Sequence, residues 1–205
     1  TGCTNKGQIR TESKESEGGN GDVALPSYLG GILGYATTSS DTGEDDRVNY
    51  NPKVIFSSCI NNGCIKARTR GNVAVGGIMG YAGMFSQITI GTGSADKCVN
   101  EIATDENHKQ GIESTNEAKF IGGILGAAYV RGDSETSTTT DNSATVNIFG
   151  ADNKADIYVK FPNTNSGEDK DCLSIGGIVG RLGAGKVEEC RNFNTLTSDE
   201  TQAEY

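Results

Sequence analysis

The chain has 205 residues, of which 29 are glycine and none is tryptophan, and only 34 % are apolar. Compact globular proteins come nearer to half apolar, so a repeat protein with a thin core fits this composition better. The net charge of -9 disfavours nucleic acid as a partner, because binding there depends on neutralising phosphates with Lys and Arg. No apolar run of about 18 residues predicts a membrane-spanning helix, so we expect no direct membrane insertion.

The chain opens with a phrase in which every second residue is fixed, Cys3-x-Asn5-x-Gly7-x-Ile9. A period of two residues is typical of a β-strand, whose successive side chains point to opposite faces. Related phrases return later, complete or in part, at residues 59–65, 98–100, 151–157 and 190–196. We expect strands at each of them. Because the chain begins inside such a phrase, we also expect it to be a piece of a longer protein.

A second phrase, apolar-Gly-Gly-Ile-apolar-Gly, occurs four times, at residues 29–34, 75–80, 121–126 and 175–180. Its paired glycines are Gly30, Gly31, Gly76, Gly77, Gly122, Gly123, Gly176 and Gly177. Recurrence at one repeat position indicates a packing requirement, met where another backbone comes too close for a Cβ atom. We interpret each phrase as a strand covered on both faces. Residues 1–205 then form a single repeat region of about four units.

The segment from Ile175 to Leu196 resembles the GLUG-type repeat, whose pattern runs apolar-Gly-Gly-Leu-apolar-Gly, a turn, and a strand near Asn-Cys. Isoleucine stands here where that family usually has leucine. The other copies match the Gly-Gly core but carry longer insertions. The resemblance implies a β-rich, solenoid-like region of a large secreted or surface-anchored bacterial protein, often adhesin-like, with no catalytic residues to carry over.

We therefore predict an all-β repeat protein, a β-solenoid similar to a parallel β-helix, with long polar loop insertions. Its thin core would hold one column of isoleucines, Ile32, Ile78, Ile124 and Ile178. The asparagines of the alternating phrase are Asn5, Asn61, Asn100, Asn153 and Asn192. They would either form an amide ladder between coils or occupy surface and turn positions, and the pattern leaves both readings open.

Six cysteines in an exported chain raise the question of disulfides. Four of them occupy one repeat position: Cys3, Cys59, Cys98 and Cys190. Because Ala151 fills the same position in another copy, the slot favours a small buried residue, and we predict packed free thiols there. Cys64 and Cys172 lie outside this register and are the one pair that we suspect of bridging.

Polar insertions separate the phrases, at Arg10–Asp22, Thr37–Arg47, Ala103–Glu117, Asp133–Thr145 and Asn163–Asp171. Insertions in stacked repeats emerge on the surface, where they can recognise partners; merely solvating or disordered loops are the alternative. The carboxylates of residues 41–46 would suit a surface calcium ion, but they lack a full ligand pattern, so we assign no metal and no cofactor. His108 has no nucleophile motif beside it, and we expect no enzyme.

Two functions from different classes follow. The first is a non-enzymatic cell-surface or secreted segment on the bacterial outer surface, an adhesive or structural stalk that presents loops. Its partners would be neighbouring repeats of the same protein and a host or cell-surface glycan or protein. The second is a carbohydrate-binding module whose ligand platform uses aromatics beside the Gly-Gly strands: Tyr35, Tyr81, Phe85 and Tyr129. Core or rim aromatics are the alternative reading.

Overall fold

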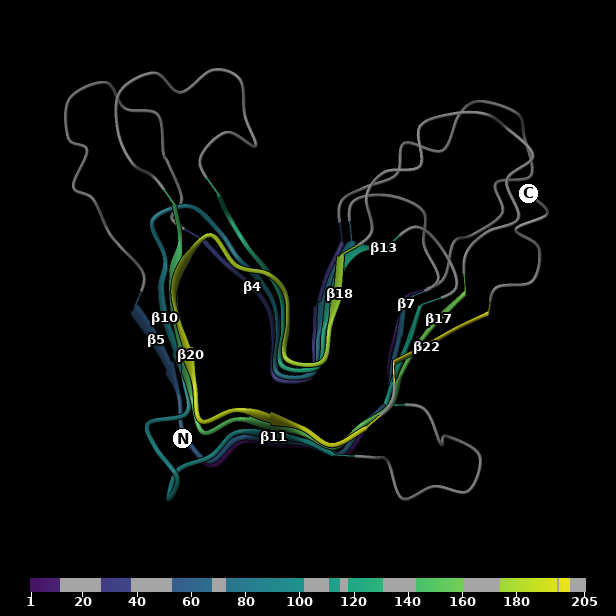
Figure 1. The fold of residues 1–205 in the computed structure, drawn as a ribbon, viewed down its shortest axis with the longest axis horizontal. Helices are drawn as coiled ribbons and strands as arrows, with labels where there is room; N and C mark the ends of the chain where they lie inside the picture. Colours follow the sequence, from purple (N-terminus) through teal and green to yellow (C-terminus); the bar gives the residue numbers. More distant parts are fainter. Residues whose placement is uncertain are drawn as a thin grey trace, which may run out of the picture.

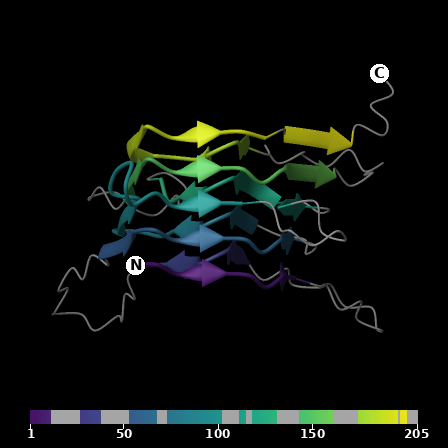
Figure 2. The same ribbon diagram turned by 90° about the horizontal axis from the view of Figure 1, so that it is seen from below.

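A computed structural model describes residues 1–11, 27–37, 53–67, 73–101, 111–114, 118–130, 143–160, 174–194 and 196–199. These residues form twenty-two strands in five parallel sheets. The chain visits the sheets in a fixed order and then climbs to the next coil, so the strands of each sheet come from successive coils. Figure 2 shows the coils stacked on one another, from the first coil to the last. The predicted β-solenoid is confirmed.

We number the sheets in the order in which the chain visits them. Sheet 1 contains β1 (Thr4–Asn5), β6 (Ile60–Asn61), β11 (Val99–Asn100), β16 (Asp152–Asn153) and β21 (Arg191–Asn192). Sheet 2 contains β2 (Ile9–Arg10), β7 (Ile65–Ala67), β12 (Ile112–Ser114), β17 (Ile157–Lys160) and β22 (Leu196–Asp199). Sheet 3 contains β3 (Tyr28–Gly30), β8 (Val73–Gly76), β13 (Ala118–Gly122) and β18 (Ser174–Gly176). Sheet 4 contains β4 (Leu33–Ala36), β9 (Met79–Ala82), β14 (Leu125–Ala128) and β19 (Val179–Arg181). Sheet 5 contains β5 (Lys53–Phe56), β10 (Gln87–Ile90), β15 (Thr145–Phe149) and β20 (Ala184–Glu188).

The Gly-Gly phrase is a pair of strands joined by a sharp bend, and our interpretation of it as one continuous strand is wrong. In the second copy, β8 ends at Gly76 and β9 begins at Met79. A Cβ atom on Gly76 would overlap the carbonyl oxygen of Met79, three residues later in the same bend. Glycine is therefore required by the bend itself. We call this strand–bend–strand unit, in sheets 3 and 4, the arch; it lies in the middle of the cross-section in Figure 1.

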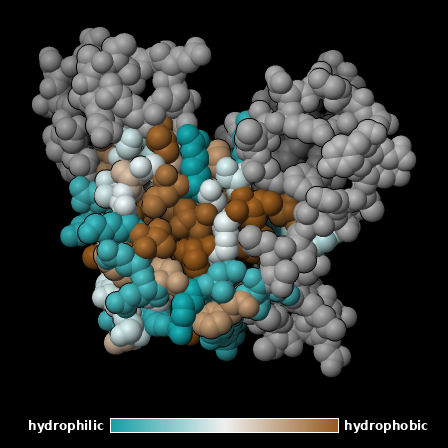
Figure 3. Space-filling model, in the orientation of Figure 1, coloured by the Kyte–Doolittle hydropathy of each residue, from teal (hydrophilic) through white to brown (hydrophobic). Residues whose placement is uncertain are grey.

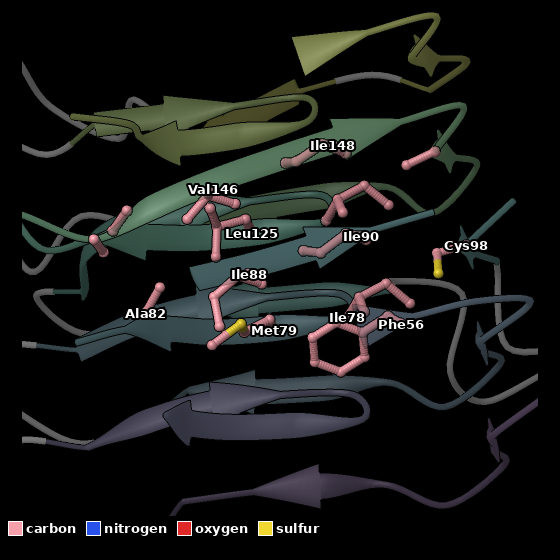
Figure 4. Packing of buried hydrophobic residues seen from close by; sticks show 14 of the residues in the cluster. Phe56, Ile78, Met79, Ala82, Ile88, Ile90, Cys98, Leu125, Val146 and Ile148 are labelled. Atoms are coloured by element: carbon pink, nitrogen blue, oxygen red, sulfur yellow. The ribbon is translucent and has the colours of Figure 1, made fainter. Parts of the chain in front are cut away.

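The arch divides the apolar interior into two clusters. The larger one joins sheets 4 and 5 to the cysteine slots, and it contains the buried side chains labelled in Figure 4, such as Met79, Ile88 and Ile148. The smaller one joins sheets 2 and 3, around Ile65 and Ile121. The isoleucine column is confirmed: the four predicted isoleucines all pack in the larger cluster, with Ile78 and Ile124 fully buried and Ile32 and Ile178 partly buried.

The asparagines of sheet 1 form a continuous amide ladder, which settles the alternative that the sequence left open. Each side-chain Nδ2 donates to the Oδ1 of the asparagine in the next coil, from Asn5 to Asn61, Asn100, Asn153 and Asn192, with N···O distances of 2.7–2.8 Å. Asn61 also donates to the carbonyl of Gly63 and accepts from the N–H of Gly63. Its amide thus makes all four hydrogen bonds that an asparagine side chain can make. A buried polar group stabilises a fold when it is satisfied in this way.

The bend of each arch rests on this ladder. A Cβ atom on Gly77 would overlap the amide of Asn100 and the carbonyl oxygen of Gly123 in the next arch. The second glycines of the other arches, Gly31, Gly123 and Gly177, meet Asn61, Asn153 and Asn192 in the same way. The second glycine is therefore required by contact between the arch and the asparagine strand of the next coil.

We predict that Gly77→Ala lowers the free energy of unfolding by about 3 kcal/mol or more, because the methyl group would overlap backbone and amide atoms that cannot withdraw. Gly7→Ala is the matched control: a Cβ atom there would stand 3.7 Å from the Asn5 side chain, an ordinary contact, and the change should stay within about 0.5 kcal/mol. Urea unfolding monitored by circular dichroism measures both. Equal stability of the two variants would contradict the packing argument.

Candidate interaction surfaces

Three tyrosines come together where sheets 3 and 4 face each other across the arch. The ring of Tyr28, from sheet 3, stacks at 4.7 Å between centroids on both Tyr35 and Tyr81, which belong to sheet 4. Tyr35 and Tyr81 lie in register in adjacent coils, as the repeat predicts, with their rings 5.7 Å apart. Burial and the neighbouring Tyr35 raise the pKa of Tyr28 above 10.0. One face of each sheet 4 ring is therefore occupied by Tyr28.

In later coils, the register positions of Tyr28 in sheet 3 and Tyr81 in sheet 4 hold other side chains, including a cation–π pair. Tyr28 is followed in sheet 3 by Ala74, Phe120 and Ser174, and Tyr81 is followed in sheet 4 by Ala127 and Arg181. In the last two coils the guanidinium of Arg181 lies 5.1 Å from the centre of the Phe120 ring, within the range of a cation–π contact. Tyr28 and Phe120 were not among the predicted platform residues: Phe120 meets Arg181 of the next coil, and Tyr28 meets both Tyr35 of its own coil and Tyr81 of the next.

The remaining predicted platform residues are placed apart from this cluster. Tyr129 is 8 % exposed and belongs to the larger apolar cluster. Phe85 is half-buried in the short turn between β9 and β10, with a positive φ of 57°. The structure therefore brings together two of the four predicted residues, Tyr35 and Tyr81, and of these Tyr35 is 43 % exposed.

A charged cluster on sheet 1 was not predicted. Asp152 accepts two hydrogen bonds from Arg191, at 3.1 Å from Nε and 2.9 Å from Nη2, and a third at 3.3 Å from Lys97. The Asp152 side chain is only 6 % exposed. Hydrogen bonding to Arg191 lowers its pKa below 3.8, although burial opposes the shift. The arrangement joins three successive coils and is an axial ion-pair network.

The thiols of the cysteine slot, Cys3, Cys59, Cys98 and Cys190, form no disulfide, as predicted, but only Cys59 and Cys98 are buried; Cys190 is partly buried and Cys3, in the first coil, is exposed. Cys98 is fully buried, and burial raises its pKa to about 11. A thiol of this kind is protonated and unreactive at neutral pH. Cys64 is also a free, buried thiol, and its suspected partner Cys172 lies outside the described residues.

The carboxylates of residues 41–46 and His108 lie outside the described residues. Among the residues that the structure does describe, no three His, Cys, Asp or Glu side chains are grouped to hold a metal ion. Over the same ranges, no helix is long and apolar enough to span a membrane.

Comparison of the chain with protein families, curated proteins and solved structures finds no match.

We predict that Asp152→Asn lowers the free energy of unfolding at pH 7 by about 1–2 kcal/mol, because the ion-pair hydrogen bonds are lost. The lowered pKa of Asp152 means that the wild-type contribution is present above the ordinary carboxyl pKa of 3.8 and disappears as pH falls through the folded-state pKa. The difference between wild type and variant should therefore stay constant from pH 7 to about pH 4 and shrink as the pH falls further. Glu188→Gln, at an exposed pair 4.0 Å long, is the control and should leave the profile unchanged. A constant Asp152→Asn difference down to acid pH would contradict this account.

Proposed function

We propose that this chain is a non-enzymatic, structural or adhesive segment of a secreted or surface-anchored bacterial protein. In this proposal the solenoid is a stalk, and the polar insertions are the elements that contact a partner, a cell-surface glycan or protein. The resemblance to GLUG-type repeats motivates the bacterial surface location. We call the stacked coils without their insertions the frame. The observation that carries the proposal is that the backbone hydrogen bonds of the frame close a corner beneath an insertion.

This closure is visible at the corner between sheets 4 and 5. In the second coil, the corner is a tight turn in which Ser86 N–H donates to the carbonyl of Gly83 at 3.2 Å. One coil later, Ala144 N–H donates to the carbonyl of Tyr129 at 3.1 Å, although the insertion of residues 131–142 separates them. The two corners are stacked directly, since Tyr129 N–H donates to Ala82 and Thr145 N–H donates to Ser86.

The frame is therefore complete without the insertion, and the insertion can change in sequence or length at little cost to the stack. The reactive or aromatic side chains that the structure describes contribute to the stack instead: the tyrosine rings stack on each other, Asp152 is paired with Arg191, and the Cys98 thiol is buried with a raised pKa. A rigid frame with independent surface segments is the organisation that stacked-repeat binding proteins use.

Deletion of residues 131–142 combined with Ser143→Gly tests the separation of frame and insertion. The variant keeps a four-residue corner like Gly83–Ser86, with glycine where Phe85 has its positive φ. We expect the melting temperature to change by no more than about 2 °C and retention of chain-coated beads on epithelial cells under shear to fall. A variant with twelve Gly and Ser residues in place of the insertion controls for loop length. Unchanged retention with both variants would contradict a contact role for this insertion.

A second candidate function is carbohydrate binding at Tyr35, which is favoured by its 43 % exposure beside Tyr81 and Tyr28. Sugars stack on exposed aromatic faces. A glycan array should then show bound sugars that are lost with Tyr35→Ala and retained with Ile55→Ala, a control at an exposed residue of sheet 5. No bound sugar, or equal loss in both variants, would contradict this function.

A further inference from the structure

The last coil ends in a step. Sheets 1 and 2 contain five strands each, whereas sheets 3, 4 and 5 contain four. As a result, β18, β19 and β20 form the outer edge of their sheets, while β21 and β22 stand one level higher beside them. This face is turned toward the viewer in Figure 3, where apolar surface is visible in its central part.

The hydrogen bonds between successive arches show which backbone groups the edge can bind. In the first arch, Gly31 N–H donates to Gly76 O at 3.3 Å, and Ile32 and Leu33 N–H both donate to Ile78 O at 3.0 and 3.1 Å. The same three bonds recur from the second arch to the third and from the third to the fourth. Each arch thus offers three N–H groups to the arch above it, and two of them converge on one oxygen.

In the last arch these three donors are Gly177, Ile178 and Val179, and within the described ranges no carbonyl accepts from them. The amide of Asn192 beside them ends the ladder, donating to the carbonyl of Asn194 with its second N–H not bonded to any described residue. Convergent N–H groups at a strand edge are a binding site for a carbonyl oxygen of an added strand.

Apolar side chains flank these donors. Ile175, Ile178, Val179 and Leu182 are only partly buried, whereas their equivalents Ile121, Ile124 and Leu125 in the coil below are fully buried. The two apolar clusters therefore continue to this face and are covered there by no further described coil. An occupant that buries them must place one apolar residue before the bend and two after it.

The backbone of the edge also selects for glycine in the occupant. The third glycine of each arch faces the coil below: a Cβ atom on Gly126 would stand 2.5 Å from Gly80 O and 2.6 Å from Val75 N. An arch seated on the last coil would meet Gly180 and Ile175 in the same way. Its first glycine is required by its own bend. Its second glycine is free to change, because the atoms that exclude a Cβ there belong to the next coil up.

A second copy of this chain does not fit this step. Its own first coil offers β3, β4 and β5 as the complementary edge, but β1 and β2 precede them and would occupy the level that β21 and β22 already fill. Complete pairing would require β1 and β2 to separate from their neighbours β6 and β7.

We propose that the edge of β18 and β19 is a docking site for an apolar-Gly-Gly-Ile-apolar-Gly arch of another polypeptide segment, added in parallel by β-augmentation. This inference rests on the stalk proposed above, and it specifies how that stalk recognises a neighbouring repeat. The bound arch accepts the three N–H groups, covers the exposed apolar columns and approaches Gly180 through its own third glycine.

Hydrogen exchange of the whole chain with a synthetic peptide tests the site. The peptide carries the sequence of residues 118–128, which contains the three glycines Gly122, Gly123 and Gly126. At a peptide concentration of about ten times its Kd, exchange at Gly177, Ile178 and Val179 should slow about tenfold. A peptide with Gly123→Ala should protect them equally, whereas peptides with Gly126→Ala or Gly122→Ala should not.

Two results would overturn the proposal. The first is no protection by the parent peptide at millimolar concentration, or equal protection by the Gly126→Ala peptide. The second is protection that appears without peptide as the chain is concentrated, together with a dimer in sedimentation, which would make a second copy the occupant. The bead assay on the insertion is unaffected by either result, so failure of docking and failure of the stalk function remain distinguishable.

Discussion

The contact between the second glycine of each arch and the asparagine ladder is the constraint on which the other features depend. An asparagine with four hydrogen bonds, such as Asn61, fixes both its own turn and its position between two coils, since two bonds run to its own turn, one to the coil below and one to the coil above. The arch can rest on this ladder only where no Cβ intervenes. With the bend in place, sheets 3 and 4 are held back to back, and the interior is necessarily split into two narrow clusters.

This arrangement explains how a chain with 34 % apolar residues forms a buried core. Each cluster is narrow, so one or two apolar residues per strand fill it, as Ile88 and Ile90 do in β10, while Gln87 and Thr89 on the opposite face of that strand are polar. The stack compensates through contacts between successive coils: the amide ladder runs through all of them, the stacked tyrosines join the first two, and the network around Asp152 joins the later ones. Repeat proteins distribute stability over neighbouring units in this manner.

The sequence predicted those features that are encoded within one repeat phrase. Alternation revealed strands of sheets 1 and 2, recurrence revealed the stack, and Ala151 in a cysteine slot indicated packed thiols. The strands of sheet 5 were not predicted, and β12 (Ile112–Ser114) lies inside the predicted insertion Ala103–Glu117. The bend at Gly76 was missed because glycine serves equally in a covered strand and in a tight turn; the deciding contact, with the carbonyl of Met79, is a backbone contact. The Asp152–Arg191 pair was missed because its members are 39 residues apart and meet only through the register of sheet 1, while insertions of unequal length obscure that register.

The ladder gives the stack a direction. Every Nδ2 donates toward the C-terminal coil, so the first asparagine offers an acceptor oxygen at one end and the last offers a donor at the other. The arches repeat this polarity, since their N–H groups also point toward the later coil. At the ladder and at the bends the two ends are therefore chemically unlike, with acceptors at the first coil and donors at the last, whereas along other strands the later coil donates to the earlier one, as Ile60 N–H does to Cys3. If two like ends met, the donors of the ladder and the bends would face donors, or their acceptors would face acceptors. The unpaired groups would then lose their hydrogen bonds to water without a replacement, which is unfavourable. An arch added to the last coil therefore has to run parallel to the others, because only then does its bend present carbonyl oxygens to the N–H groups of Gly177, Ile178 and Val179.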